Sequence, residues 1–121
     1  MNEQDYRPVW DAYASAWQIT SALERLSVLK KNLSEDNNYT DPLMQTRGYD
    51  QLSEYMAQFQ EQFPGCYFET KYFLQHHGRS IARWDMKNDK GEAISEGISF
   101  AEYSDNGLLV AETGFYEVPE E

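Results

Sequence analysis

The stretch Tyr39-Thr40-Asp41-Pro42 stands between two amphipathic segments and sets one carboxylate on a short connection. Pro42 disfavours helix at the residue before it, so residues 39–41 are expected to be extended. Aromatic residues make up 15% of this chain, which makes an aromatic-lined hollow plausible on composition alone. Asp41 is then either a general base beside such a hollow or a turn residue that bonds its own backbone next to Pro42.

Helical spacing surrounds this stretch on both sides. Trp10, Tyr13, Ala14 and Trp17 fall at i, i+3, i+4 and i+7, the spacing of one helical face. A second helix is expected to begin near Ser21, since Ser21-x-x-Glu24 forms a capping box. Residues 34–38 are polar and acidic and predict a loop, and a third helix is expected from Gly48 to the breaker Pro64-Gly65.

From Cys66 onward the hydrophobic pattern alternates with a period of two. Strands are expected at about residues 66–77, 80–88, 93–103 and 107–118, with a hairpin turn at Asp105-Asn106-Gly107. Helices followed by an antiparallel meander predict an α+β fold, with the helices on one face of a mostly antiparallel sheet. The length of 121 residues fits a single domain covering residues 1–121.

Composition narrows the classes of function. The net charge of −11 repels phosphate backbones, so no nucleic-acid partner is expected. The mean hydropathy is −0.77, and no apolar run reaches the ~20 residues of a membrane span. The N-terminus lacks the features of a secretory leader, and the single Cys66 allows no internal disulfide, so we expect a cytoplasmic protein. No metal-binding, phosphate-loop or dinucleotide motif is present, so no metal and no cofactor is expected.

The order of these features resembles a known family. Helices, an acidic loop, Tyr39-Thr40-Asp41-Pro42, Arg47-Gly48 before a helix and long strands ending in Gly114-Phe115 are similar to the SnoaL-like branch of the nuclear transport factor 2-like superfamily. The resemblance covers about residues 6–118. It implies a strongly curved sheet wrapped around helices, a cone with a pocket. Members include ketosteroid isomerase, polyketide cyclases, dehydratases and non-catalytic binding modules, so the fold does not fix the function.

The resemblance to ketosteroid isomerase can be carried over residue by residue. It places the catalytic base at Asp41, the tyrosine donor near Trp17 and the protonated aspartate near Ser99. Trp17 and Ser99 can each donate one hydrogen bond, but neither reproduces that oxyanion hole. Loss of one such donor costs ~10²–10³-fold in rate, which disfavours steroid isomerisation but not another proton transfer.

Strand alternation gives a candidate pocket lining. Phe68, Thr70, Tyr72, Leu74 and His76 form the more apolar set on their strand and are expected to point inward. His76 is either a proton shuttle or an ordinary strand-end histidine, and Trp84 and Tyr103 are either ligand contacts or core. With residues from the helices and the other strands, the predicted ligand-binding set is Tyr13, Trp17, Tyr39, Phe59, Tyr72, His76, Trp84, Ser99 and Tyr103.

Apolar residues also occupy the other strand face. Ile81, Ile98 and Phe100 fall there, and helices can cover only one face, so a homodimer through this outer face is expected. The predicted function is a pocket for a small apolar molecule. The alternative is an isomerase, cyclase or dehydratase with Asp41 as general base, which requires Asp41 in an open hollow with a donor near the substrate. A binding or dimerisation module would instead have the hollow filled by Trp17, Tyr39 and Trp84.

Overall fold

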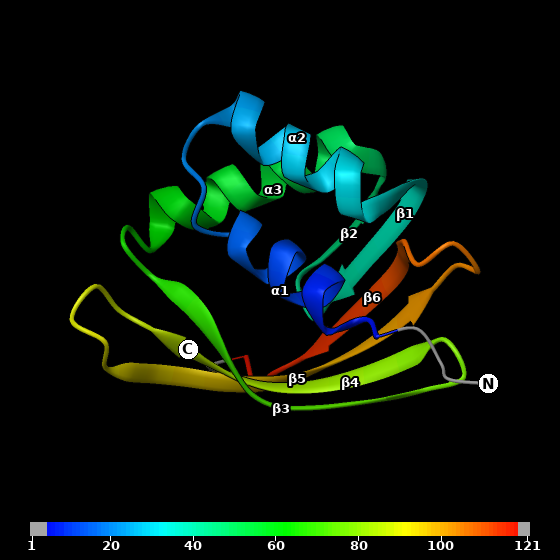
Figure 1. Cartoon of the computed structure of the whole chain (residues 1–121). Helices are drawn as coiled ribbons and strands as arrows, with labels where there is room; N and C mark the ends of the chain where they lie inside the picture. Colours follow the sequence, from blue (N-terminus) through cyan, green and yellow to red (C-terminus); the bar gives the residue numbers. More distant parts are fainter. Residues whose placement is uncertain (1–4, 119–121) are drawn as a thin grey trace.

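The computed structural model describes residues 5–118, in which three helices pack on one face of a six-stranded sheet (Figure 1). The helices are α1 (Arg7–Ala16), α2 (Ala22–Asn32) and α3 (Gly48–Gln62). The strands are β1 (Leu33–Asp41), β2 (Met44–Arg47), β3 (Tyr67–His76), β4 (Arg79–Lys87), β5 (Ala93–Tyr103) and β6 (Leu109–Phe115). The predicted α+β class is confirmed. No helix within residues 5–118 is both long and apolar enough to cross a membrane.

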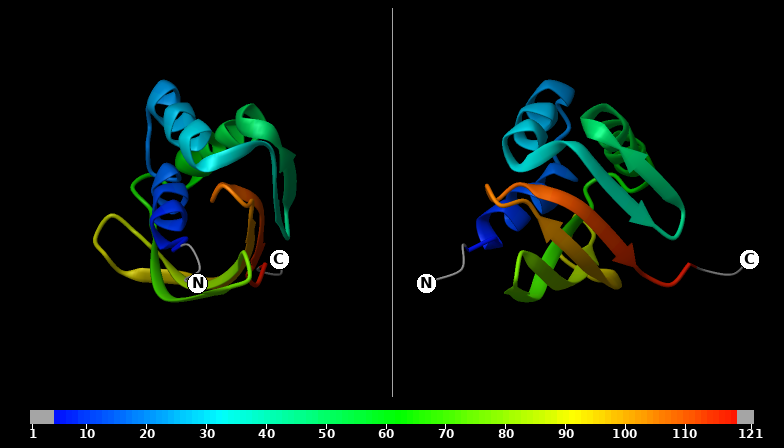
Figure 2. Two further views of the ribbon diagram at one scale, coloured as in Figure 1. Left: turned by 45° about the vertical axis from the view of Figure 1, so that its right-hand side comes forward. Right: turned by 90° about the vertical axis from the view of Figure 1, so that its right-hand side faces the viewer.

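The sheet has the order β2-β1-β6-β5-β4-β3 and is antiparallel except where β1 pairs with β6 in parallel. It curves around α1, so that β3 and β4 lie below the helix and β1 and β2 rise beside α3 (Figure 2). One side of the sheet is therefore concave and faces the helices, and the other is convex.

Helix α1 lies in the concavity and supplies much of the core. Pro8 at its start costs no hydrogen bond, because the first backbone N–H groups of a helix have no partner within it. Its spacing buries Trp10, Tyr13 and Ala16, and Trp17 follows as a buried C-cap. Tyr6, just before the helix, stacks on Tyr103 of β5 with ring centroids 4.2 Å apart and closes one end of the cone.

The loop predicted at residues 34–38 is wrong, because these residues belong to β1. Backbone pairing to β6 holds this strand, with an irregular register between Leu33 and Asn38. Its polar side chains lack the alternating pattern by which a strand is recognised in a sequence. Within this irregular part Asn37 is buried, and its amide Nδ2 donates to the carbonyl of Ser34 at 2.8 Å. The short strand β2, which pairs with residues 38–41, was also not expected.

The inward face predicted for β3 is wrong in its second half. The register to β4 shifts between Thr70 and Tyr72, and the extra residue, Lys71, reverses the alternation. Beyond it Phe73 packs on Trp10 and Gln75 accepts a hydrogen bond from the backbone N–H of Tyr6. The side chains predicted to point inward, namely those of Tyr72, Leu74 and His76, are exposed instead.

Candidate functional site

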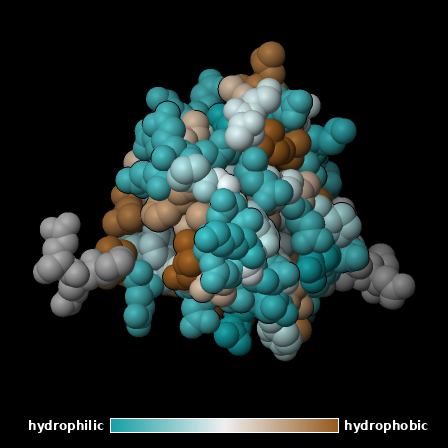
Figure 3. All heavy atoms as spheres, turned by 90° about the vertical axis from the view of Figure 1, so that its left-hand side faces the viewer, coloured by the Kyte–Doolittle hydropathy of each residue, from teal (hydrophilic) through white to brown (hydrophobic). Residues whose placement is uncertain are grey.

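A cavity of about 620 Å³ opens between α3, the strands β3 to β5 and the segment after β6. Asp41 and Tyr55 lie in its wall together with Trp17, Phe59 and Phe68. The other lining residues are Leu43, Gln58, Glu61, Gln62, Phe63, Trp84, Met86, Ile94, Ser95, Tyr116, Glu117 and Val118. Figure 3 views this end of the molecule, where hydrophobic side chains reach the surface between hydrophilic ones. The cavity is thus a largely aromatic and aliphatic hollow that also carries polar groups from Asp41, its tyrosines and several Gln, Glu and Ser side chains.

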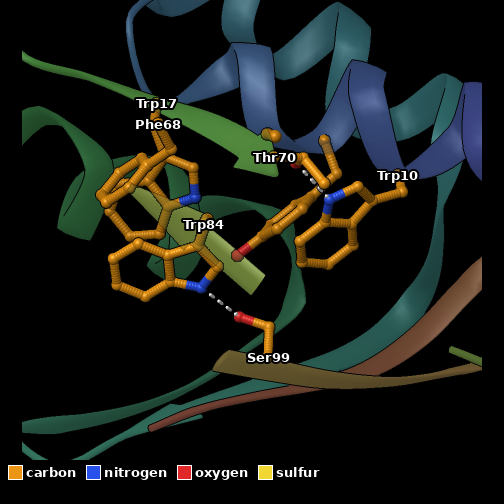
Figure 4. Close-up of a pocket in the computed structure, with 8 residues that line it drawn as sticks. Trp10, Trp17, Phe68, Thr70, Trp84 and Ser99 are labelled. Carbon is orange, nitrogen blue, oxygen red and sulfur yellow. Dashed lines mark hydrogen bonds between the residues drawn. The ribbon is translucent and has the colours of Figure 1, made fainter. Parts of the chain in front are cut away.

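A second cavity of about 40 Å³, the inner cavity, lies against α1, and the 620 Å³ cavity is the outer one. The inner cavity is lined by Trp10, Tyr13, Ala14, Trp17, Phe68, Thr70, Trp84 and Ser99 (Figure 4). Trp17, Phe68 and Trp84 line both cavities and form an aromatic partition between them. The ring centroid of Phe68 lies 5.7 Å from that of Trp17 and 5.0 Å from that of Trp84. The indole Nε1 of Trp84 donates to Ser99 Oγ at 3.0 Å, which fixes the edge of the partition (Figure 4).

Asp41 ends β1, and both of its carboxylate oxygens are engaged. Oδ1 accepts the backbone N–H of Leu43 at 2.8 Å, which is the Asx-type turn expected beside a proline. Oδ2 accepts hydrogen bonds from the hydroxyls of Tyr39 at 2.5 Å and Tyr55 at 2.9 Å. Asp41 is therefore a turn residue, as one interpretation of the sequence predicted. It is also buried in the wall of the cavity, which is the position that the general-base interpretation requires.

Three tyrosines surround this carboxylate. Tyr116 interacts with both Asp41 and Tyr55 and completes the set formed with Tyr39. Burial, followed by the hydrogen bond to Asp41, raises the pKa of Tyr55. Burial and then the charge of Asp41 raise the pKa of Tyr116 to about 12. These hydroxyls keep their protons near neutral pH, and Tyr39 and Tyr55 donate theirs to Asp41 Oδ2.

A second carboxyl group, Glu112 of β6, is buried beside the inner cavity. Its Oε2 accepts the hydroxyl of Tyr13 at 3.2 Å, and Ser99 also interacts with it. Burial raises its pKa to about 8, and the charge of Asp41 adds to this against the opposing hydrogen bonds from Ser99 and Tyr13. Glu112 is therefore mostly protonated at neutral pH, and as an acid it can donate a hydrogen bond.

Gly114 explains how the two carboxyl groups fit together. A Cβ atom at this position would lie 3.7 Å from Glu112 Oε1, 3.8 Å from Asp41 Cβ and 3.8 Å from Ser99 Oγ. The three side chains thus converge on one small space left by the glycine. A carboxylate that accepts hydrogen bonds and a neutral carboxylic acid are placed around the same point, an arrangement that suits proton transfer.

The structure brings most of the predicted site residues together. Trp17 and Trp84 line both cavities, Phe59 lines the outer one, and Tyr13 and Ser99 line the inner one. Tyr39 lies behind Asp41 and bonds to it. The sequence analysis expected an open hollow beside Asp41 for an enzyme and a hollow filled by aromatic side chains for a binding module. The structure shows part of each, since aromatic side chains fill one part of the hollow while Asp41 faces the open part.

Three predicted ligand contacts lie elsewhere. Tyr72 and His76 point away from both cavities because of the register shift in β3. Tyr103 is buried, but its hydroxyl pairs with that of Ser80 at 2.8 Å and its ring stacks on Tyr6, at the far end of α1. Tyr103 is a core residue of the closed end.

Sequence reasoning missed Tyr55, Glu112 and Tyr116. Tyr55 shares the apolar face of its helix with Leu52 and Met56, so its spacing marked it as core. The only signal for Glu112 is its place two residues before Gly114, opposite Ala101 in the pairing of β6 with β5. No group of three or more His, Cys, Asp or Glu side chains that could hold a metal ion occurs among the described residues.

Comparison with known proteins agrees with the fold described above. The model of the SnoaL-like domain matches residues 10–112, whereas no curated protein matches the chain. A SnoaL-like protein from Agrobacterium tumefaciens, provisionally assigned as an isomerase, superposes with a TM-score of 0.86 at 20% identity, covering 93% of this chain and 97% of that one. A protein from Sinorhizobium meliloti, provisionally assigned as a polyketide cyclase, gives 0.70 at 10% identity, covering 88% and 93%.

A third neighbour was solved with a ligand. This protein from Catenulispora acidiphila, of ketosteroid isomerase-like fold and in complex with trimethylamine, has a TM-score of 0.71 at 12% identity, and the match covers 93% of this chain and 87% of that one. At such low identities these likenesses show the fold alone, which is the nuclear transport factor 2-like fold. The family follows from the domain model, which spans most of the sequence. The chain belongs to the SnoaL-like family.

Proposed function

We propose that the chain binds a small, largely apolar molecule in the 620 Å³ cavity. The observation that carries this proposal is an open, aromatic-walled hollow with a few converging polar groups, Asp41 and its tyrosines, at one side. Ligand pockets in proteins typically have volumes of ~300–1,000 Å³ and this kind of lining. The neighbour in complex with trimethylamine supports the proposal in that a protein of this fold holds a small organic molecule.

A neutral fluorescent probe, N-phenyl-1-naphthylamine, tests this proposal. Ser95 lines the cavity, so Ser95→Phe places a bulky ring in it and should weaken the rise in probe fluorescence. Glu96→Phe is the matched control, because Glu96 is the exposed neighbour of Ser95 on the same strand and does not line the cavity. Equal probe binding by both variants would show that the probe does not occupy the cavity and would contradict the proposal.

A second candidate function is proton transfer, with Asp41 as general base. The observation in its favour is a pair of neighbouring carboxyl groups in different environments, since burial raises the pKa of Glu112 to about 8 while Asp41 accepts three hydrogen bonds. Tyr55 and Tyr116 place hydroxyls beside Asp41 in the cavity wall, where a substrate oxygen that gains charge would compete with Asp41 for their protons. An isomerase, a cyclase and a dehydratase all begin with such a step.

Asp41→Asn tests this second candidate. Tyrosine hydroxyls accept as well as donate, so Tyr39 and Tyr55 can turn to receive the new amide, and the protein should stay folded. An amide cannot take up the proton, so turnover should fall ~10²–10⁴-fold. The measurement is the exchange of α-protons for deuterium in a panel of cyclic ketones, followed by NMR. An active wild-type protein with an equally active Asn variant would remove Asp41 from the mechanism.

The convex face supports the proposal of a homodimer. Leu74, Ile81 and Phe100 are register partners across β3, β4 and β5, and all three are exposed. The next row holds Tyr72, Arg83, Ile98 and Phe115, so the correction to β3 adds an aromatic side chain to this face, with Arg83 as the one charge in the row. Exposed apolar side chains gathered on one face in this way are typical of an interface.

Sedimentation tests the dimer. Ile98→Asp should convert a dimer into a monomer, because it replaces the apolar side chain between Arg83 and Phe115 by a charged one. Leu23→Asp, at an exposed position on α2, is the control and should leave the assembly unchanged. A wild-type chain that sediments as a monomer at micromolar concentration would contradict the proposal.

A further inference from the structure

The wall of the 620 Å³ cavity carries acidic groups, and neither cavity wall carries a basic one. Asp41, Glu61 and Glu117 line the outer cavity, with Asp41 buried in the wall and the two glutamates exposed at its rim. None of the ten Lys and Arg residues and neither His lines either cavity. Any ligand in this hollow therefore meets a negative potential, within a chain whose net charge is −11.

The aromatic walls act in the same direction. Trp17 and Phe59 meet edge to face with ring centroids 5.4 Å apart, and Phe59 stacks on Phe68 at 5.2 Å. Trp84 meets Phe68 edge to face, so ring faces and ring edges both bound the hollow. The face of an aromatic ring carries negative charge and attracts a cation within ~6 Å of its centroid. Two independent features of the cavity, its charges and its rings, thus favour a positive ligand.

We infer that the ligand is an organic ammonium compound, a cationic amine with an apolar body. This inference rests on the proposed binding function and adds the charge of the ligand to it. The ammonium group faces Asp41 and the oxygens of Tyr55 and Tyr116, and the apolar body contacts Phe63, Met86 and Ile94. The backbone of Leu43 and the hydroxyls of Tyr39 and Tyr55 hydrogen-bond to Asp41, and Tyr116 also interacts with it, so a cation meets Asp41 through its charge and not through a free acceptor position.

Anionic ligands do not fit this site. A carboxylate or phosphate group needs cationic or backbone N–H partners, and no Lys, Arg or His offers one in the walls. A neutral apolar molecule gains the same burial as the cation but neither of the two electrostatic contributions. Small hydrated metal ions gain nothing from the apolar walls that dominate the surface of the cavity. An ammonium group on an apolar body is the chemistry that uses every part of the lining.

The test compares three probes of one shape with the unaltered protein. Benzyltrimethylammonium, its neutral isostere neopentylbenzene and the anion phenylmethanesulfonate share a ring and differ in charge. Binding is followed by the fluorescence of the wall residues Trp17 and Trp84 and by calorimetry. We expect the cation to bind at least ~10-fold more tightly than the neutral isostere and the anion not to bind. The affinity for the cation should fall as salt is added.

A pair of double variants locates the effect. Glu61→Gln with Glu117→Gln removes the two rim charges without touching the buried network, and should weaken the cation ~2–5-fold while leaving the neutral isostere unchanged. Glu96→Gln with Glu102→Gln removes two exposed charges from β5 outside the cavity lining and should change neither affinity.

The outcomes separate this inference from the function on which it rests. Equal or tighter binding of the neutral or anionic probe would overturn the preference for cations and leave the pocket intact. Absence of binding by all three probes, together with absence of N-phenyl-1-naphthylamine binding, would overturn both. A loss of cation affinity of the same size in both double variants would assign the effect to net charge and overturn the role of the cavity rim.

Discussion

The Glu112→Gln variant should be more stable than the wild type, and the difference in the free energy of unfolding should grow as the pH rises. The side chain of Glu112 is 3% exposed, and its pKa is raised from 4.5 to about 8. A group whose folded-state pKa is raised contributes stability that is fully present below the unfolded-state pKa. That stability is lost as the pH rises through the folded-state pKa, because the unfolded chain releases the proton first. The loss for Glu112 therefore runs from about pH 4.5 to about pH 8.

The magnitude follows from the size of the shift. Each pKa unit corresponds to 1.36 kcal/mol, so the full shift amounts to about 5 kcal/mol and the part lost by pH 7 to about 3 kcal/mol. Glutamine keeps the shape and an oxygen for the hydroxyl of Tyr13, but it does not ionise. The free energy of unfolding of Glu112→Gln should equal that of the wild type below about pH 4.5 and exceed it by about 3 kcal/mol at pH 7.

Urea denaturation at a series of pH values, followed by tryptophan fluorescence, measures this difference. Titrating groups that do not interact with Glu112 contribute equally to both proteins and cancel in the difference, which leaves Glu112 and its coupling to Asp41. Glu102→Gln is the matched control, since it removes a glutamate from the exposed face of the neighbouring strand. A difference between Glu112→Gln and wild type that stays constant from acid to alkaline pH would refute the assignment of a raised pKa to this group.

Two further predictions concern packing and capping. A Cβ at Gly97 would lie 2.3 Å from the Trp84 ring and 2.8 Å from the carbonyl oxygen of Phe115, so Gly97→Ala should displace the indole, shift its fluorescence and cost ~1–3 kcal/mol in urea denaturation. Gly114→Ala is its control, because the nearest atoms there stand at ordinary contact distances, and a cost as large as that of Gly97→Ala would contradict the steric argument. Ser21 caps α2 by accepting the backbone N–H of Glu24, so Ser21→Ala should lower the free energy of unfolding by ~1 kcal/mol. Ser21→Asp should retain the cap and the stability. Equal losses in both variants would exclude capping as the reason.

The helices and the four later strands could be predicted because their signals are local. The spacing of Trp10, Tyr13 and Trp17 follows one helical face, and the cap at Ser21 needs only the residue three positions on. β1 could not be found in this way. Its stability comes from backbone pairing with a strand about 70 residues later in the chain, and its polar side chains carry no alternating pattern.

The candidate site was predicted where a motif or a periodic pattern marks it, as at Asp41, Phe59 and Trp84. The resemblance located Asp41, but no pattern marks Glu112, since a glutamate on a strand is normally a solvent-facing residue. The exposed positions of Tyr72 and His76 depend on one extra residue, Lys71, whose effect appears only when β3 is paired with β4. Alternation along a single strand cannot reveal a change of register, because both registers have the same period.

The loss of stability that Glu112 causes at neutral pH indicates where the candidate site lies. A buried carboxyl group with a raised pKa lowers stability at neutral pH, and a glutamine of the same shape would avoid this. Groups of this kind cluster at functional sites, where the local environment serves chemistry or recognition at the expense of stability. The closed end of the cone, with Tyr6 on Tyr103, holds no such group among the described residues. Asp41 lies in the wall of the open cavity, and Glu112 is buried close to it across the space left by Gly114, so a ligand held in the cavity would lie near both carboxyl groups.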